Sequence, residues 1–235
     1  MSQEVVIERL FEALIDGDRK AAMAVVSEQF DAGVDAERMI TDLLWPAYNL
    51  IDRMFRSDEL TVLSNNMATR LLRVIADRVA DRLEMTELPI GRSVLAFCGP
   101  TEGEELGAQM AVDILESKGF DVRFAGSNVA NDELLGAMHS VQPDVLLAFC
   151  SGPCDLPALR ALIDTMREIG ACSETQIVVG GGVFNRAEGL AEEIGADLWA
   201  DDPLELAHTM IMDPDQRAMP EQRTVGRGRK TRQAA

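Results

Sequence analysis

The spacing of apolar residues divides the chain into a helical half and an α/β half. Through residues 4–84 apolar side chains return every three or four positions, and no alternating run typical of a strand occurs there. Polar breaks at residues 16–18, near residue 35 and at residues 56–58 separate four amphipathic segments, and Pro46 should kink the third. Four helices with short connections are typical of an up-and-down bundle.

After residue 88 short apolar runs alternate with amphipathic segments. The predicted elements, in chain order, are strand 93–98, helix 102–118, strand 121–125, helix 131–140, strand 144–150, helix 156–169, strand 176–180, helix 187–194, strand 197–200 and helix 203–212. Five such pairs predict a doubly wound, flavodoxin-like (Rossmann-like) parallel sheet. We therefore predict an α/β protein with a four-helix bundle at 1–87, a five-stranded sheet domain at 88–213 and a disordered basic tail at 214–235.

The ends of the first and third strands are where we expect a ligand, because doubly wound sheets bind ligands near the switch in strand order. Cys98 and Cys150 end these strands, and Cys154 follows closely. Three converging thiols could bind a soft metal or undergo redox chemistry. However, their spacing is not that of a zinc ribbon, and cysteine is a common buried residue of ordinary strands. Both interpretations stay open.

The charge of the chain limits its partners. It has 22 Lys and Arg against 40 Asp and Glu, a net charge of −18. Residues 1–213 carry 16 basic and 38 acidic side chains, a net charge of −22, and such a body repels phosphate backbones. We expect no direct DNA binding by it. No apolar stretch is long enough to span a membrane and the N-terminus is unlike a signal peptide, so we expect a cytoplasmic protein.

Several short stretches together carry a resemblance to a known family. They are residues 45–51 (WPAYNLI), 99–107 (GPTEGEELG), 178–185 (VVGGGVFN) and 194–197 (IGAD). With them the chain resembles cobalamin-binding modules, in which a four-helix bundle precedes a Rossmann-like domain. It is most similar to the sensory members, the light-responsive cobalamin-dependent repressors and the antirepressors of photosynthesis genes. The resemblance covers nearly all of the chain before the tail and implies a ligand between the two halves.

In the sensory members the cofactor loop reads Glu-x-His-x-x-Gly. Glu102 and Gly107 match its acidic and glycine positions, but Glu104 stands where the resemblance implies the cobalt-binding histidine. A neutral imidazole is a good cobalt ligand. The substitution therefore removes the family's expected protein ligand to the metal.

Other positions that the resemblance places near the cofactor also differ. Light-responsive members have a Trp and a Glu-His pair over the cofactor, whereas this chain has Phe55, Asn65 and Asn66. The third-strand motif is altered as well, and Ser151 is the hydroxyl that could lie near the nucleotide tail. The remaining expected contacts are the glycines of the turn after the fourth strand: Gly180, Gly181 and Gly182.

The only histidines are His139 and His208. Both fall on predicted helices and should point away from the carboxyl ends of the strands. We therefore expect cobalt, if present, to have no histidine ligand. The resemblance then implies base-on cobalamin, a related tetrapyrrole or no cofactor.

Three functions follow as hypotheses. The main prediction is a sensory or regulatory module that binds cobalamin and acts on a protein partner such as a DNA-binding regulator, with a homo-oligomer left open. The alternative is a corrinoid carrier for methyl transfer, which the missing histidine weakens because such ligands tune the cobalt ion. A further alternative is a degenerate scaffold that holds no cofactor.

Overall fold

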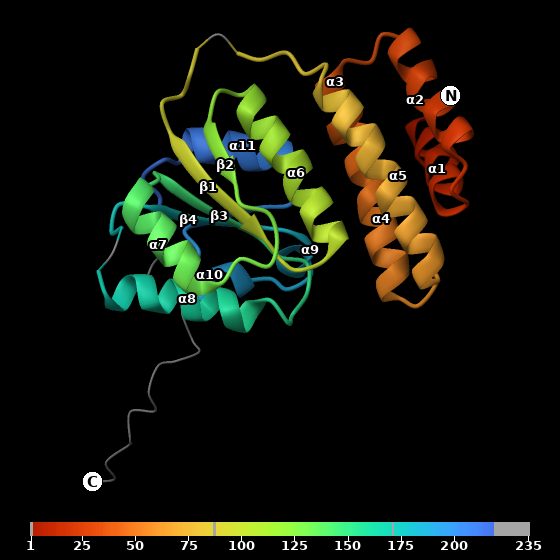
Figure 1. Cartoon of the computed structure of the whole chain (residues 1–235). Coiled ribbons are helices and arrows are strands. Elements are labelled where there is room, and N and C mark those ends of the chain that lie inside the picture. Colours follow the sequence, from red (N-terminus) through yellow and green to blue (C-terminus); the bar gives the residue numbers. More distant parts are fainter. Residues whose placement is uncertain (1, 87, 171, 219–235) are drawn as a thin grey trace.

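The computed structural model describes residues 2–86, 88–170 and 172–218 (Figure 1). A bundle of helices lies beside a sheet that has helices on both of its faces. The predicted α/β fold, with a helical N-terminal part and a five-stranded parallel sheet, is confirmed. Within the described ranges no helix is both long and apolar enough to cross a membrane.

The bundle consists of α1 (Gln3–Ile15), α2 (Arg19–Asp31), α3 (Ala36–Arg38), the π-helical segment η1 (Met39–Leu44), α4 (Trp45–Arg56) and α5 (Val62–Ala80). Because α3, η1 and α4 follow one another without a break, they form one rod, and the bundle has the four rods that the apolar spacing predicts. Asp18, Asp35 and Thr61 each precede a helix and accept a hydrogen bond from a backbone N–H three residues later.

The expected disturbance at Pro46 takes the form of the π-helical segment directly before it. Proline has no backbone N–H, so the carbonyl four residues earlier loses its helical partner. That carbonyl, on Asp42, instead accepts a hydrogen bond of 2.7 Å from the side chain of Gln3. The interruption of α4 thus ties the third rod to the first.

The sheet contains β1 (Ser93–Cys98), β2 (Asp121–Phe124), β3 (Val145–Phe149), β4 (Gln176–Gly180) and β5 (Leu198–Ala200). Its strands are parallel in the order β2-β1-β3-β4-β5, which confirms the flavodoxin-like topology. Cys98 pairs with Phe149, and Phe149 pairs with Gly180. The carboxyl ends of the three central strands therefore meet at one edge.

Helices α6 (Glu102–Ser117) and α11 (Pro203–Met212) cover one face of the sheet, and α7 (Asn131–Val141), α8 (Leu156–Glu168) and α10 (Leu190–Ile194) cover the other. The core of the first face is continuous with the core of the bundle, because α5 and α4 pack against α6. Trp45 of α4 meets Phe149 of β3 edge to face, with ring centroids 6.2 Å apart.

Two segments differ from the expectations. The helix predicted at 187–194 is instead the short α9 (Gly182–Asn185) followed by α10, since Gly181 and Gly189 adopt positive φ angles of 104° and 78° that end regular structure. Residues 214–218 of the predicted tail lie against the sheet domain, where Arg217 donates a hydrogen bond of 2.8 Å to the carbonyl of Glu174. The rest of that tail, residues 219–235, lies outside the described residues.

Candidate functional site

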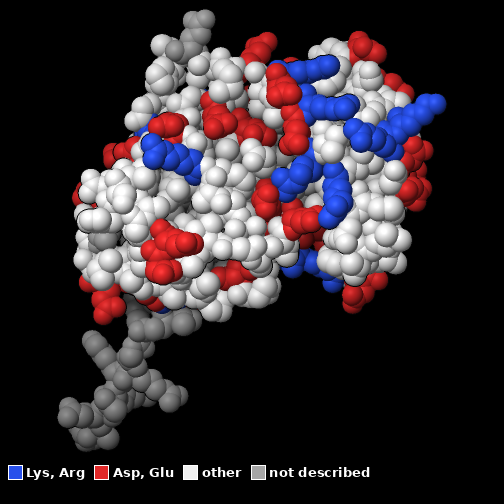
Figure 2. Space-filling model, viewed as in Figure 1, with Lys and Arg blue, Asp and Glu red and all other residues white. Residues whose placement is uncertain are grey.

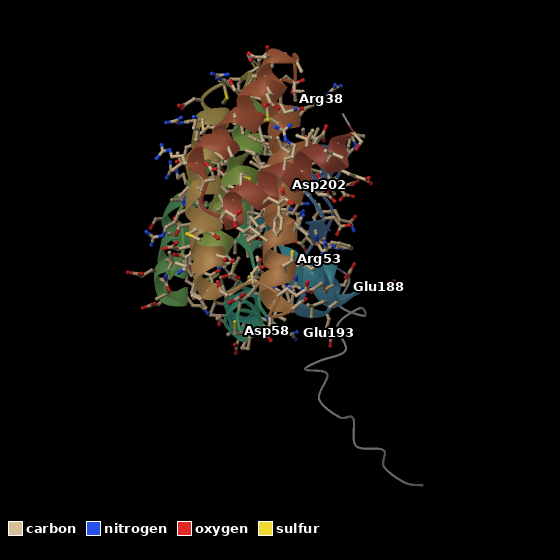
Figure 3. All side chains as sticks on the ribbon, turned by 90° about the vertical axis from the view of Figure 1, so that its right-hand side faces the viewer. Arg38, Arg53, Asp58, Glu188, Glu193 and Asp202 are labelled. Atoms are coloured by element: carbon tan, nitrogen blue, oxygen red, sulfur yellow. The ribbon has the colours of Figure 1, made fainter. Side chains whose placement is uncertain are left out.

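A cleft of about 930 Å³ lies between the bundle and the carboxyl edge of the sheet, where the strand order predicts a ligand. Its bundle wall comes from α4, α5 and the turn between them, and its sheet wall from the loops that follow β1 and β3. The lining residues are Tyr48, Ile51, Asp52, Phe55, Arg56, Asp58, Leu60, Thr61, Val62, Asn65, Asn66, Thr69 and Leu72 of the bundle, and Thr101, Glu102, Gly103, Glu104, Leu106, Gly152 and Cys154 of the sheet domain. In Figure 3, Asp58 marks the lower end of the bundle at which this cleft is found.

Glu104 is the most constrained side chain of the sheet wall. It is 3% exposed, and its Oε2 accepts hydrogen bonds of 3.0 and 2.7 Å from the backbone N–H and the hydroxyl of Thr101. The Thr101 hydroxyl in turn accepts from the backbone of Glu104, which completes a capping box at the start of α6. Oε1 accepts a bond of 2.8 Å from the backbone N–H of Ser151. The carboxylate therefore joins the loops after β1 and β3.

A second carboxyl group, Asp155, is paired with Glu104. Burial alone would raise the pKa of Glu104, but hydrogen bonds from Asp155, the Ser151 amide and Thr101 outweigh it and hold the pKa below its usual range. Burial and the hydrogen bond to Glu104 raise the pKa of Asp155. Within the pair Glu104 is therefore the stronger acid and Asp155 the weaker one.

Two buried hydroxyl groups lie beside this pair. Tyr48 is 6% exposed and Ser151 is 2% exposed, and no described residue forms a hydrogen bond with either hydroxyl. Burial raises the pKa of Tyr48, and the nearby Ser151 hydroxyl offsets only part of that effect. A Cβ on Gly107 would lie 2.8 Å from the Tyr48 hydroxyl and 2.7 Å from Phe149, so only glycine fits there. Buried polar atoms without partners are uncommon, and these two lie together behind the wall of the cleft.

Comparison with known families identifies the family of this chain. One family model described as a B12 binding domain matches residues 92–207, and a second model of the same description matches residues 6–79. The chain belongs to the B12-binding family. The two matches meet at the cleft, because one covers its bundle wall and the other its sheet wall.

Relatives within this family are similar over nearly their whole length. The monomethylamine corrinoid protein 2 of Methanosarcina acetivorans is 23% identical, over 90% of this chain and 98% of the relative. The dimethylamine corrinoid protein 1 of the same organism is 24% identical, over 87% and 95%. The structure of the monomethylamine corrinoid protein of Methanosarcina barkeri shares the fold, with a TM-score of 0.76 at 18% identity over 90% of this chain and 99% of that one.

These relatives correct two predictions. They are named as corrinoid proteins of methylamines and not as sensors, so the sensory or transcription-regulating module predicted from the sequence is wrong. The DNA-binding regulator as partner is wrong for the same reason. The prediction of cobalamin as the ligand is confirmed by both family models.

The described residues also fit the family's B12 cofactor. The cleft offers a broad space with apolar side chains such as Ile51, Phe55 and Leu72 alongside polar ones. Tyr48 also lines the cleft, with its hydroxyl buried at the rear beside Gly107. A Cβ on Gly103 would have only the Thr101 hydroxyl, at 4.0 Å, within 4 Å. Glycine at this position therefore leaves open space beside the cleft.

The structure brings together part of the predicted B12 site. Phe55, Asn65, Asn66, Glu102 and Glu104 all line the cleft. Gly107 and Ser151 lie directly behind its wall and are buried. The three remaining predicted contacts do not line it: Gly180, Gly181 and Gly182. A Cβ at Gly181 would strike the carbonyl of Cys150, which is a packing reason for that glycine.

The three thiols at this edge have different surroundings. Cys98 and Cys150 are 5% and 2% exposed, and burial raises the pKa of Cys98 to about 12 and that of Cys150 further. Cys154 is exposed and lines the cleft, and its neighbour Asp155 raises its pKa. Among the residues that the structure describes, no group of three or more His, Cys, Asp or Glu is arranged to hold a metal ion by itself.

The histidines lie where the topology predicts. His139 is on α7 and His208 on α11, both are exposed, and neither lines the cleft. The predicted absence of a histidine ligand to cobalt is consistent with this placement and stays a prediction.

Sequence reasoning missed three residues of the site. Tyr48 and Asp155 are not among the residues predicted for the site, and the sequence does not connect Asp52 with Arg186. Asp52 of α4 accepts a hydrogen bond of 2.9 Å from Arg56 and lies 3.5 Å from Arg186, which donates to the carbonyl of Ser151. The polar residues at 48 and 52, one turn apart on a helix that otherwise buries apolar residues, were the available signal.

Proposed function

We propose that this protein is a corrinoid carrier for methyl transfer. The observation that carries the proposal is the cleft, which lies between two segments that each match a B12-binding model. Support also comes from the corrinoid proteins of methylamines, which are similar over both halves of the chain. When bound, a corrinoid supplies a cobalt ion that can hold a methyl group and release it.

The bundle would cover one side of the corrinoid and the sheet domain would support the other. Ile51 and Phe55 offer apolar contact from α4, and Asn65 and Asn66 offer amide groups from α5. Tyr48 would contribute the surface of its ring at the rear of the cleft, because its hydroxyl is buried beside Gly107. These contacts bind and orient the cofactor and exclude water from it.

Glu104 would not serve as the cobalt ligand in this site. Both of its oxygens already accept hydrogen bonds from Thr101 and Ser151, and its side chain is buried. Its function is to hold together the two loops that form the floor. The carrier would then differ from family members that have the histidine, because no ligand at this position would adjust the electronic properties of the cobalt ion.

A carrier must also meet the enzymes that deliver and remove the methyl group. Val62, which lines the cleft, is 64% exposed, and the adjacent Leu63 is 68% exposed. Exposed apolar side chains at the mouth of a ligand site are typical of a surface that contacts another protein. We propose that methyltransferases contact the molecule there, at the start of α5.

The proposal is tested by loading the purified protein with hydroxocobalamin, reducing it with titanium(III) citrate and adding methyl iodide. We expect the absorption of the methylated corrinoid to appear and to stay with the protein after desalting. A Gly103→Phe variant places a large side chain at the cleft without clashing with neighbouring protein atoms. We expect it to bind the corrinoid at least about tenfold more weakly, which corresponds to about 1.4 kcal/mol of binding free energy.

The matched control is Gly136→Phe on α7. Gly136 is likewise helical, and a Cβ there would meet no atom within 4 Å, but it lies outside the cleft. This variant should retain the corrinoid as the wild type does. Loss of corrinoid from the wild type on reduction or methylation would contradict the carrier function, and equal retention by both variants would place the corrinoid elsewhere.

A further inference from the structure

A second hollow of about 490 Å³ lies on the bundle, between α2 and the C-terminal half of α5. We call it the α2–α5 groove. Val26 of α2 and Ile75 and Val79 of α5 line it and are buried, so its base is apolar. It shares no lining residue with the cleft described above. The proposed corrinoid function therefore does not account for it.

Two guanidinium groups, four residues apart in the chain, lie along this groove. Arg78 donates a long hydrogen bond of 3.8 Å to the sulfur of Met23, and the guanidinium carbon of Arg82 lies 4.3 Å from the centre of the Phe30 ring. Both arginines are exposed. A thioether is a weak acceptor, and an aromatic ring attracts a cation through its face. Each guanidinium therefore still has N–H groups for a stronger acceptor.

Arginines without a carboxylate partner are notable in this chain, because it has 40 Asp and Glu against 22 Lys and Arg. Arg70 and Arg73, earlier on α5, pair with carboxylates of α6. In contrast, neither Arg78 nor Arg82 forms an ion pair with a described carboxylate. Asp81 also lines the groove, which leaves two guanidiniums against one carboxylate. The groove is thus a local positive site on an acidic molecule.

The chemistry of an occupant follows from these features. It must bring carboxylates to two cations and apolar side chains to the surface between them. An amphipathic helix does both, because residues four apart lie on the same face of a helix and match the spacing of the two arginines. Residues 1–213 carry a net charge of −22, which repels a nucleic acid. Protein carboxylates are therefore the favoured acceptors.

We infer that the α2–α5 groove binds an acidic amphipathic helix of a partner protein. Carboxylates of that helix pair with Arg78 and Arg82, and its apolar side chains cover Met23 and Phe30. This surface is distinct from the methyltransferase contact proposed at Val62, because 16 residues of α5 place Val62 and Arg78 about 24 Å apart. The inference goes beyond the proposed function and does not depend on it.

The test uses a fluorescently labelled synthetic peptide of about 15 residues, with Leu along one helical face and Glu on both sides of it. Its binding to the full-length protein is followed by fluorescence anisotropy at low ionic strength. We expect saturable binding, and weaker binding of the same peptide with Gln in place of every Glu. Arg78→Gln combined with Arg82→Gln should weaken binding of the Glu peptide at least about tenfold.

A second variant, Ser27→Glu, keeps both arginines and adds a carboxylate to the groove. Ser27 is exposed and lines the groove, so the added charge should weaken binding of the Glu peptide without disturbing the core. The matched control is Arg38→Gln combined with Arg53→Gln. Both residues are exposed, lie on the same bundle outside the groove and are labelled in Figure 3. This control loses the same charge and should bind the peptide as the wild type does.

Circular dichroism of all variants should match that of the wild type. The inference is overturned if the wild type does not bind the Glu peptide, or if the Arg78→Gln, Arg82→Gln protein binds it as tightly as the control. Sedimentation equilibrium of the protein alone examines a different occupant. We expect the same mass for the wild type and for the groove variant, and self-association lost only in the groove variant would assign the groove to a second copy of this chain and overturn the inference.

Discussion

At the scale of single residues, Glu104 shows how one substitution can change the role of a motif position. The resemblance assigns this position to a metal ligand. In this protein the carboxylate instead caps α6 and accepts a hydrogen bond from the backbone N–H of Ser151. Hydrogen bonds to a charged group each contribute about 1.5–3 kcal/mol, and a buried donor that loses its partner costs about as much. Glu104 is therefore a stabilising residue of the floor.

We predict that Glu104→Ala lowers the free energy of unfolding by about 2–4 kcal/mol, because it leaves the amides of Thr101 and Ser151 without their acceptor. Glu104→Gln should cost less, since the amide oxygen can still accept from one of them. Urea unfolding followed by circular dichroism measures both values.

Glu102→Ala is the control, two residues earlier on the same helix. Its side chain is 60% exposed and paired with Arg70, and such surface pairs contribute only about 0–1 kcal/mol. Equal destabilisation by the two alanine variants would contradict the role given to Glu104.

The sequence located this position but not its conformation. The capping box could be anticipated from Thr101 and Glu104, which are three residues apart. The bond to Ser151 joins residues 47 positions apart, and the pairing with Asp155 depends on the same loop. Only the packing of β1 beside β3 brings these groups together, so no local pattern reports it. The same is true of the unpartnered Tyr48 hydroxyl.

At the scale of elements, α6 joins the two parts of the molecule and carries an unusual acid. Asp113 of α6 is partly buried, and its carboxylate accepts a hydrogen bond of 2.7 Å from the side-chain amide of Gln109. Burial raises its pKa to about 6, with further contributions from the charges of Glu116 and Asp77. The folded state therefore binds a proton more tightly than the unfolded chain, whose carboxyl has a pKa near 3.8.

The consequence for stability has a definite sign. Between about pH 4 and pH 6 the folded state holds more protons than the unfolded state, so stability falls as the pH rises through this window. We predict that Asp113→Asn removes this fall and, at pH 7.5, raises the free energy of unfolding by about 1 kcal/mol, a figure reduced for solvent screening. Urea unfolding at pH 4.5 and 7.5 measures the difference.

Asp31→Asn, at the exposed end of α2, serves as the control. It should change the free energy of unfolding only slightly, and by the same amount at pH 4.5 and pH 7.5. If Asp113→Asn has the same effect at pH 4.5 as at pH 7.5, the acid is not the source of the pH dependence.

Most elements could be predicted, and the exceptions have physical causes. The bounds of β1 and β4 agree with the apolar runs, β2 and β5 are one residue shorter at one end, and β3 is one residue shorter at each end. Buried parallel strands are nearly continuous in apolar residues, which makes them easy to find. The division between α9 and α10 was missed because the positive φ angles of Gly181 and Gly189 depend on how the chain leaves the sheet.

At the scale of the whole molecule, the bundle is joined to the sheet domain by packing and by ion pairs. Figure 2 shows basic and acidic side chains close together where the bundle meets the sheet domain. On one side of the cleft Arg70 and Arg73 of α5 pair with Glu102 and Glu105 of α6. Elsewhere Asp52 bridges Arg56 and Arg186. Asp52, Arg56 and Glu102 line the cleft, and their ion pairs with Arg186 and Arg70 link its two walls.

Asp52 has a central position among them because it faces two guanidinium groups from different halves of the molecule. Without its charge, Arg56 and Arg186 would repel each other, and Arg186 would lose its tie to α4 while keeping its bond to the Ser151 carbonyl. We predict that Asp52→Asn increases amide hydrogen exchange at the end of α4 and at the end of β3, with an overall loss of about 1 kcal/mol of stability.

The comparison variant is Glu28→Gln, which weakens the 2.9 Å pair with Arg9 between α1 and α2 and so acts within the bundle alone. It should raise exchange in those two helices and leave β3 unchanged. The difference between Asp52→Asn and the wild type should shrink in 1 M NaCl, because partly exposed charges are screened over about 3 Å at that ionic strength. An exchange pattern confined to α4, with β3 as protected as in the wild type, would mean that the Trp45–Phe149 contact and the shared apolar core hold the bundle in place without the ion pair.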